Sequence, residues 1–181
     1  MSLLAEEIVE EWLNRDGYFT IRGIKIGVDE IDILAIKPSN SGDFERRHFE
    51  VTVSIRPVSY ISRLPKAIQK GSGRAPNTSK RSWDEVVEGV GEWVENKFRK
   101  KKKLKIMNAL CPGDWTSELV VNVVKFPDEL KEIERHGIRI HKLPAILKKL
   151  GRNGGVIQSA CGADLMDLVQ MSRVKRKDSS K

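Results

Sequence analysis

Two acidic side chains interrupt segments that otherwise have the pattern of buried β-strands. Asp32 lies within the apolar run 30–37, and Glu50 lies on the polar face of the alternating run 46–54. An unpaired carboxylate facing an apolar interior is energetically costly, so such acids usually pair with a cation or hold a metal ion. Because the two runs are near each other in the chain, they predict neighbouring strands that share a cation site.

The order of the predicted elements indicates an α/β fold. Helical periodicity, capping residues and β-branched runs predict, in chain order, a helix at 3–14 ended by Gly17, strands at 18–26, 30–37 and 46–54, a loop at 70–81, a helix from Ser82 to Phe98, a strand at 118–126, a helix from Pro127, a strand at 138–141, and helices at 144–150 and 163–171. Strands between helices, followed by a helix that crosses to a further strand, favour a three-layer sandwich with a mixed central β-sheet flanked by helices.

Length and composition fit one domain without a membrane segment. The 181 residues are enough for a substantial core, and we expect a single domain over 1–172. No apolar run reaches the roughly 18 residues of a membrane span, and no secretory signal is present, so we expect a cytoplasmic protein with no membrane partner. Two cysteines, Cys111 and Cys161, are too few for a disulfide framework or a zinc cluster.

The positive charge is concentrated in two short segments. Residues 97–105 carry seven basic side chains and no acid, and the tail 173–181, which we expect to be disordered, has a net charge of +4. Since the chain as a whole has a net charge of +8, the remainder is slightly acidic. The internal cluster therefore predicts contacts with nucleic-acid phosphates, and its alternative is a solvated helix end. Its members are Lys97, Arg99, Lys100, Lys101, Lys102, Lys103 and Lys105.

The first third of the chain resembles a known nuclease superfamily. A glutamate-bearing helix, the pair Gly17-Tyr18, the strand around Asp32 and the strand around Glu50 resemble the PD-(D/E)XK superfamily, in particular its restriction-endonuclease-like and Mrr-like members. The resemblance covers about residues 5–54 well and 118–150 more loosely. It implies a restriction-endonuclease-like fold and metal-dependent hydrolysis of DNA. Because related nucleases often dimerise to cut both strands, it also leaves a homodimer open.

The resemblance implies a specific set of site residues. Asp32, Glu50 and the main-chain carbonyl of Val51 would hold Mg²⁺ or Mn²⁺, and Glu6, eleven residues before the Gly-Tyr pair, would complete the site. From the residues alone, Asp32 and Glu50 could instead be a buried salt-bridge pair, and Glu6 could be one solvated acid among four on its helix.

The sequence departs from the superfamily at the position of its lysine. Thr52 stands two residues after Glu50, where the lysine normally orients the attacking water and offsets charge on the phosphate. Threonine can hold a water molecule but supplies no positive charge. We therefore expect a basic group from elsewhere, or an impaired site; the residues considered as substitutes are His48, Lys66 and Lys70.

Two functional hypotheses follow, from different classes. The first is a metal-dependent DNA endonuclease, which the retained acids favour. The second is a catalytically impaired nuclease-fold module that binds nucleic acid without cutting it, which the missing lysine favours. A small-molecule enzyme has little support, because the chain has no Gly-rich phosphate loop after a strand, no HExxH motif and no nucleophile elbow.

Overall fold

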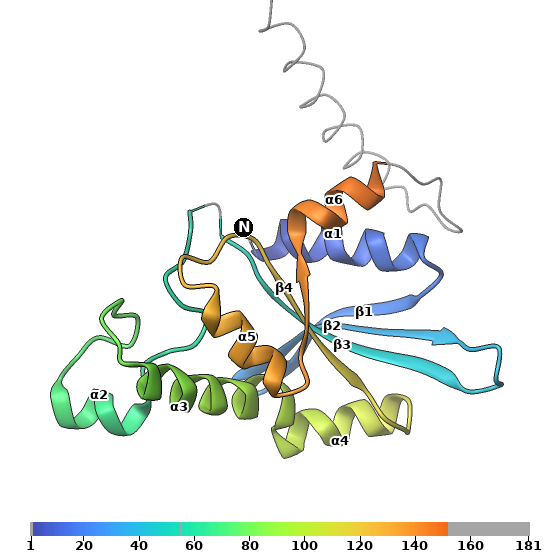
Figure 1. Cartoon of the computed structure of the whole chain (residues 1–181). Helices are drawn as coiled ribbons and strands as arrows, with labels where there is room; N and C mark the ends of the chain where they lie inside the picture. The colour runs from blue at the N-terminus through green and yellow to red at the C-terminus, as the bar shows by residue number, and fades with distance from the viewer. Residues whose placement is uncertain (1, 55, 152–181) are drawn as a thin grey trace, which may run out of the picture.

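The chain folds into three layers, with a central β-sheet between two layers of helices (Figure 1). The computed structural model describes residues 2–54 and 56–151. The elements are, in chain order, α1 (Ser2–Arg15), β1 (Phe19–Ile26), β2 (Asp29–Pro38), β3 (Phe44–Thr52), α2 (Lys66–Ser72), α3 (Trp83–Val94), the π-helical turn η1 (Glu95–Arg99), α4 (Lys101–Leu110), β4 (Thr116–Val121), α5 (Asp128–Arg135), β5 (Arg139–Lys142) and α6 (Leu143–Leu150). The predicted three-layer α/β sandwich is thereby confirmed.

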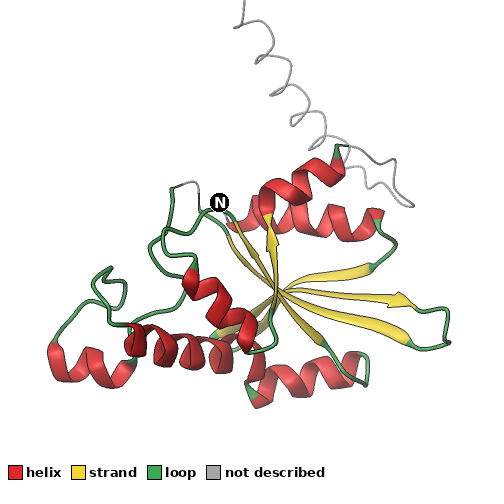
Figure 2. Cartoon of the chain, in the orientation of Figure 1, coloured by secondary structure: helices red, strands yellow, loops and turns green. Residues whose placement is uncertain are grey.

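The sheet is mixed, as the element order predicts. Its five strands lie in the order β1-β2-β3-β4-β5. Strand β2 is antiparallel to both of its neighbours, β1 and β3, and β3, β4 and β5 are parallel to one another. Figure 2 shows the strands crossing at the centre of the molecule with helices on either side. Strand β3 therefore lies in the middle of the sheet, where both faces are covered.

Each face of the sheet packs against its own group of helices. On one face, α1 and α6 bury apolar side chains that include Val9, Leu13, Phe49, Val120 and Ile146. On the other face, α3, η1 and α5 pack through side chains that include Val90, Phe98, Leu119, Val121 and Ile133. Because side chains alternate along a strand, Phe49 faces α1 while its neighbours on β3 face the layer of α3 and η1.

Local signals in the sequence determine several helix ends. Helix α1 ends where Gly17 adopts a φ of 88°, which only glycine adopts without strain, and the Gly17 amide donates to the Asn14 carbonyl oxygen at 3.0 Å. Helix α3 begins with the predicted capping box, in which Ser82 and Glu85 each accept a hydrogen bond from the main-chain amide of the other. These signals are read correctly from the sequence alone because each depends on residues within one helical turn.

The structure corrects the sequence-based elements in the long connection between β3 and β4. The sequence predicts a loop at 70–81, but in the structure the first residues of this segment belong to helix α2. The helix expected from Ser82 to Phe98 changes to a π-helical turn at Glu95, and the basic cluster that follows it forms a separate helix, α4. The strand expected at 118–126 ends at Val121, with residues beyond it in irregular structure.

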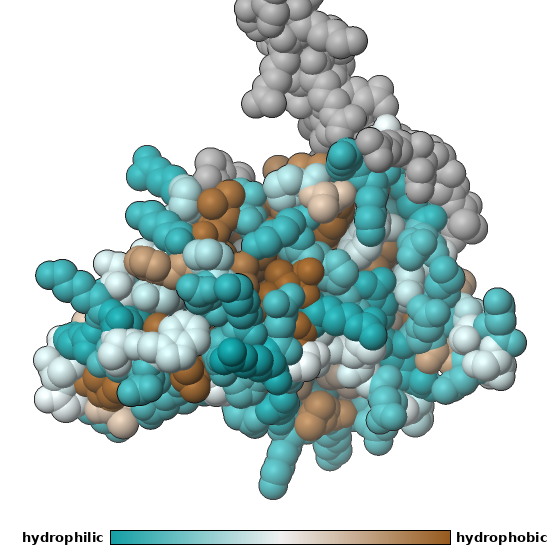
Figure 3. All heavy atoms as spheres, viewed as in Figure 1, coloured by the Kyte–Doolittle hydropathy of each residue, from teal (hydrophilic) through white to brown (hydrophobic). Residues whose placement is uncertain are grey.

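Three features predicted near the C-terminus lie outside the described residues: the helix at 163–171, the basic tail at 173–181, and Cys161. No helix in the described part of the chain is long and apolar enough to cross a membrane. In the view of Figure 3 the surface is mostly hydrophilic, and apolar residues are visible in small separate groups.

Candidate functional site

Glu50 is the centre of a buried charge network on β3. Its side chain is 0 % exposed, and both carboxylate oxygens accept hydrogen bonds from lysines. Lys97 Nζ lies 2.6 Å from Oε2, and Lys103 Nζ lies 2.6 Å from Oε1. The Nε2 atom of His48 is 3.3 Å from Oε1. Two lysines thus neutralise a carboxylate that could not remain ionised in this interior without them.

Asp32 lies beside this network at an irregular point of β2. Ile33 packs under α1, whereas Ile31 packs with Leu34 in the apolar group next to α4, so the alternation of side chains along the strand is interrupted at Asp32. The ladder between β2 and β3 ends at the same point, and the Val51 amide donates to Asp32 Oδ2 at 2.7 Å. This irregularity lets the Asp32 carboxylate take the place of a main-chain acceptor next to Glu50.

The two carboxyl groups have pKa values shifted in opposite directions. Burial, followed by the charge of Glu50, raises the pKa of Asp32 to about 7, and the negative charge of Glu6 adds to the shift. Burial also acts to raise the pKa of Glu50, but the hydrogen bond from His48 and the charges of Lys97 and Lys103 hold it below its usual range. Separated pKa values in neighbouring carboxyl groups are typical of catalytic and metal sites, and they also occur in structural ion-pair networks.

Both lysines come from the point where α3 passes into η1 and α4. Lys97 lies within η1, and its main-chain oxygen accepts a hydrogen bond from Lys103 Nζ at 2.8 Å. The side chain of Lys97 is 38 % exposed, whereas that of Lys103 is 1 % exposed. Insertions of this π-helical kind often occur at functional sites, because they redirect the side chains of a helix. The fold thus supplies Glu50 with one inaccessible cation and one that reaches solvent.

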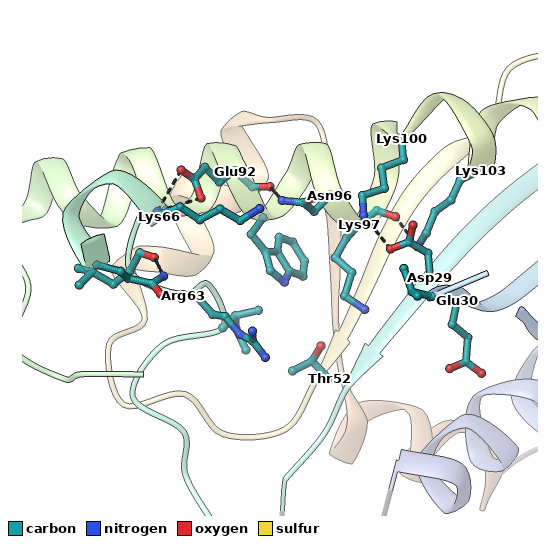
Figure 4. Close-up of a pocket in the computed structure, with 16 residues that line it drawn as sticks. Asp29, Glu30, Thr52, Arg63, Lys66, Glu92, Asn96, Lys97, Lys100 and Lys103 are labelled. Atoms are coloured by element: carbon teal, nitrogen blue, oxygen red, sulfur yellow. Dashed lines mark hydrogen bonds and ion pairs between the residues drawn. The ribbon is translucent and has the colours of Figure 1, made fainter. Parts of the chain in front are cut away.

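Thr52 and Lys97 line the same pocket at the edge of this network (Figure 4). Thr52 continues the strand face of Glu50, and its hydroxyl faces the space into which Lys97 extends. A lysine side chain therefore lies in the same pocket as Thr52. Of the substitutes considered from the sequence, His48 contacts Glu50, whereas neither Lys66 nor Lys70 forms an ion pair with it.

Glu6 is buried, on α1, and is an electrostatic neighbour of Asp32. Its expected alternative, a solvated acid on the helix surface, is therefore wrong. The other expected alternative, a buried salt bridge, does describe the contacts of Glu50. The structure thus brings Glu6, Asp32 and Glu50 into one electrostatic group.

The basic cluster at 97–105 does not form one uniform surface. Lys97 and Lys103 turn inward to Glu50, and Lys100 and Lys102 form ion pairs with Asp29 on the β1–β2 hairpin. For Lys103, which is buried, the expected contact with nucleic-acid phosphates is therefore wrong. Of the others, Arg99 pairs with Glu95, and Lys101 and Lys105 are exposed with no partner among the described residues.

The donor set fits a divalent cation only in part. Among the described residues, no group of three or more His, Cys, Asp or Glu side chains is arranged around one point. None of the described residues donates a hydrogen bond to the second oxygen of Asp32, and the Asp32 carboxyl group feels the charge of Glu50. Burial and the charge of Glu50 disfavour the ionised form of Asp32, so a cation beside Asp32 would be electrostatically favoured. These residues fit a metal ion if Lys97 moves away from Glu50 Oε2.

The two inward-facing lysines, Lys97 and Lys103, lie at helical spacing from apolar residues in the sequence. The meaning of this spacing becomes clear once the fold is known. Lys97 follows Val90 and Val94 at helical spacing, and Lys103 precedes Met107 by one turn. A lysine at a periodic apolar position indicates a buried or half-buried cation that needs an acidic partner. The density of basic residues in 97–105 instead predicts that all of them, including Lys97 and Lys103, lie on the surface.

Comparison with known proteins gives a fold likeness and no function. No protein-family model matches the chain, and no curated protein matches it. A solved structure described as "Crystal Structure of Protein of Unknown Function AF1548" is similar, with 15% sequence identity and a TM-score of 0.47. The alignment covers 82% of this chain and 67% of that one.

Proposed function

We propose that this protein is a divalent-metal-dependent nuclease that hydrolyses phosphodiester bonds in DNA. Asp32, Glu50 and the main-chain carbonyl of Val51 would hold the metal ion, Mg²⁺ or Mn²⁺, with Glu6 assisting. The observation that carries the proposal is the Lys97 ammonium, which lies 2.6 Å from Glu50 Oε2 and is partly exposed. Lys97 would thus supply the positive charge that Thr52 cannot.

The chain's own residues account for most of the chemistry. Lys97, released from Glu50, is placed to donate hydrogen bonds to a phosphate oxygen on which negative charge develops. Thr52 can hold a water molecule through its hydroxyl in the same pocket. Lys103 and His48 keep the Glu50 carboxylate oriented, because both hold Oε1 and neither is accessible to a substrate. The metal ion, when bound, would lower the pKa of the attacking water and screen the phosphate.

The proposal is tested by moving the lysine between two positions. In DNA cleavage assays with Mg²⁺ or Mn²⁺, Lys97→Ala should lower the rate by about 100-fold or more, because a group that stabilises developing charge is removed. Adding Thr52→Lys to Lys97→Ala should restore part of the rate, since residue 52 opens into the same pocket. Lys148→Ala is the matched control: this lysine is exposed on α6, has no partner among the described residues, and should leave the rate unchanged.

Two results would contradict the proposal. If Lys97→Ala cleaves DNA as fast as the parent, Lys97 has no catalytic role. If the parent cleaves neither single-stranded, duplex nor branched DNA with either metal, and calorimetry detects no Mg²⁺ binding that Asp32→Asn removes, the nuclease proposal fails. The contacts of Glu50 would then be those of a structural ion-pair network in a module that binds nucleic acid without cutting it.

A further inference from the structure

A pocket of about 630 Å³ opens beside Glu50, between the end of β3, the segment 61–66 and helix α3. The volume lies within the range of about 300–1,000 Å³ that is typical of small-molecule sites, and is too small for a nucleic-acid duplex to enter. Figure 4 shows Lys97 and Thr52 on one side of the pocket and Arg63 and Lys66 on the other, and Lys97 is hydrogen-bonded to Glu50. A ligand in this pocket would therefore lie directly against the proposed catalytic site.

The wall formed by 61–64 is held in place by several buried contacts. Glu129 accepts hydrogen bonds from the main-chain amides of Ile61 and Ser62, at 2.6 and 2.8 Å, and from the Ser62 hydroxyl at 2.6 Å. On the other side, Gly89 of α3 lets the Arg63 carbonyl approach closely, since a Cβ at Gly89 would lie 2.5 Å from that oxygen. The pocket is thus formed before a ligand arrives, and ordering it costs little on binding.

Two cations in this pocket remain available to a ligand. Of its five basic residues, Lys97 and Lys103 are paired with Glu50, and Lys100 is paired with Asp29. The side chains of Arg63 and Lys66 have no hydrogen-bond or ion-pair partner among the described residues, and both are exposed. The acids Glu30 and Glu92 also line the pocket, so its charge favours a single phosphate group at the Arg63 side and not a dense polyanion.

The remaining surface of the pocket suits a planar aromatic ring. Trp93 is partly exposed, lines the pocket, and is held by an edge-to-face contact with Phe98 at 5.7 Å between ring centroids. Asn96 uses its amide nitrogen in a hydrogen bond to the Glu92 carbonyl oxygen at 2.7 Å, which leaves its side-chain oxygen as an acceptor. A fixed indole with a nearby acceptor is the arrangement on which nucleobases stack and donate hydrogen bonds.

We propose that this pocket binds one unpaired nucleotide of a single-stranded DNA segment, with the base against Trp93 and the phosphate at Arg63 and Lys66. A base within a duplex is stacked on its neighbours and could not enter the pocket. The preferred substrates are therefore single strands, or duplexes with unpaired nucleotides next to the cleaved bond. The assignment rests on the proposed function in taking DNA as the ligand.

The test measures binding without cleavage. Fluorescence anisotropy, in EDTA and on an Asp32→Asn background, compares a labelled single strand of about 12 nucleotides with its duplex. Trp93→Ala should weaken single-strand binding by about tenfold or more and duplex binding by less than about twofold, because only an unpaired base reaches the indole. Trp83→Ala, which removes a tryptophan that is 47 % exposed and lies outside the pocket, should change neither affinity.

A second variant keeps the test decisive if Trp93→Ala does not fold. Arg63→Gln with Lys66→Gln changes only exposed side chains, and it should flatten the salt dependence of single-strand binding by about 1.4 in log affinity per log salt, about 0.7 for each cation. Equal losses on single strand and duplex in Trp93→Ala, or an unchanged salt slope in the double variant, would overturn the assignment.

These experiments can contradict the pocket assignment and the nuclease proposal independently of each other. A protein that never cleaves DNA but shows the predicted losses in binding keeps the pocket assignment and loses the nuclease proposal. A protein that cleaves DNA but binds single strands equally well in all variants shows the reverse. No metal is present in the binding assay, so its result does not depend on how Asp32 and Glu50 hold one.

Discussion

The ionisation of Asp32 is energetically costly in this fold. Its pKa of about 7, raised by burial and by the charge of Glu50, lies well above the value of 3.8 expected for an unfolded chain. Between these two values the folded protein holds a proton that the unfolded chain has lost. Stability must therefore fall as the pH rises from about 4 to about 7, and the full penalty is present above pH 7.

We expect Asp32→Asn to stabilise the metal-free protein, and to do so more at pH 8 than at pH 5. Asparagine cannot ionise, and its carbonyl oxygen can still accept the hydrogen bond from Val51. Each pKa unit corresponds to about 1.4 kcal/mol, so the gain should grow by about 2 kcal/mol between the two pH values, after allowance for the partial exposure of Asp32. Urea unfolding in EDTA measures this difference.

The control for this experiment is Asp114→Asn, which changes an exposed aspartate outside the network and should give the same small effect at both pH values. An equal gain from Asp32→Asn at pH 5 and pH 8 would mean that Asp32 ionises normally in the folded protein. Burial and the charge of Glu50 would then not disfavour the ionised form of Asp32.

Helix α3 contains two glycines whose replacement should have opposite effects. A Cβ at Gly89 would lie 2.5 Å from the Arg63 carbonyl oxygen, whereas a Cβ at Gly91 would have no atom within 4 Å. Gly91→Ala should stabilise the protein by about 0.5–1 kcal/mol through helix propensity. Gly89→Ala gains the same propensity but forces the segment 62–64 off the helix, at a cost of about 1–3 kcal/mol, so its net effect should be destabilising.

Thermal or urea unfolding of the two variants checks this prediction, and each serves as the other's control. Stabilisation by both substitutions would show that the segment 62–64 moves away from α3 without cost. The pocket wall next to Arg63 would then be easily deformed, and the argument that the pocket is formed in advance would lose its structural basis.

The elements that the sequence predicts well are those whose signals are local. The capping box at Ser82 and the left-handed end of α1 at Gly17 depend on a few adjacent residues. Helix α4 is different, because it has no side-chain cap and four of its first five residues are lysines. Its one strong reason to form is the burial of Lys103 and Met107 against other parts of the fold.

The residues of the candidate site also differ in whether the local sequence is enough to identify them. Asp32 and Glu50 can be identified from the sequence, because an acid in an apolar strand pattern is a local anomaly. Their cationic partners cannot, because Lys97 and Lys103 are 47 and 53 residues away from Glu50 and reach it only through the packing of η1 and α4 on the sheet. The tertiary packing of the chain therefore decides which of the basic residues turn inward.

The surface that contacts a DNA backbone should be smaller than the basic cluster 97–105. Only Lys101 and Lys105 are exposed and unpartnered among the described residues of that cluster. Lys101→Gln with Lys105→Gln should flatten the salt dependence of duplex binding by about 1.8 in log affinity per log salt, about 0.9 for each lysine, without changing the fold. Anisotropy titrations at several salt concentrations, with circular dichroism as the check on folding, measure both.

The control for this surface is Lys142→Gln with Lys148→Gln, two exposed lysines at β5 and α6, in the layer opposite α4. If only the net charge of the protein mattered, both double variants would flatten the salt dependence of duplex binding equally. If DNA contacts a local surface on α4, only the variant with Lys101→Gln and Lys105→Gln will flatten it. Equal slopes in both variants would mean that no particular face of the protein holds the DNA.

The distance along the chain between Glu50 and its lysines also has a consequence for synthesis on the ribosome. At about 5–20 residues per second, β2 and β3 emerge several seconds before Lys97 and Lys103. During that interval the antiparallel hairpin of β2 and β3 holds Asp32 and Glu50 without the two lysines that pair with Glu50 in the folded protein. The nascent hairpin therefore has an electrostatic reason to remain open and hydrated, and the sheet can close over its acids only once η1 and α4 have left the exit tunnel.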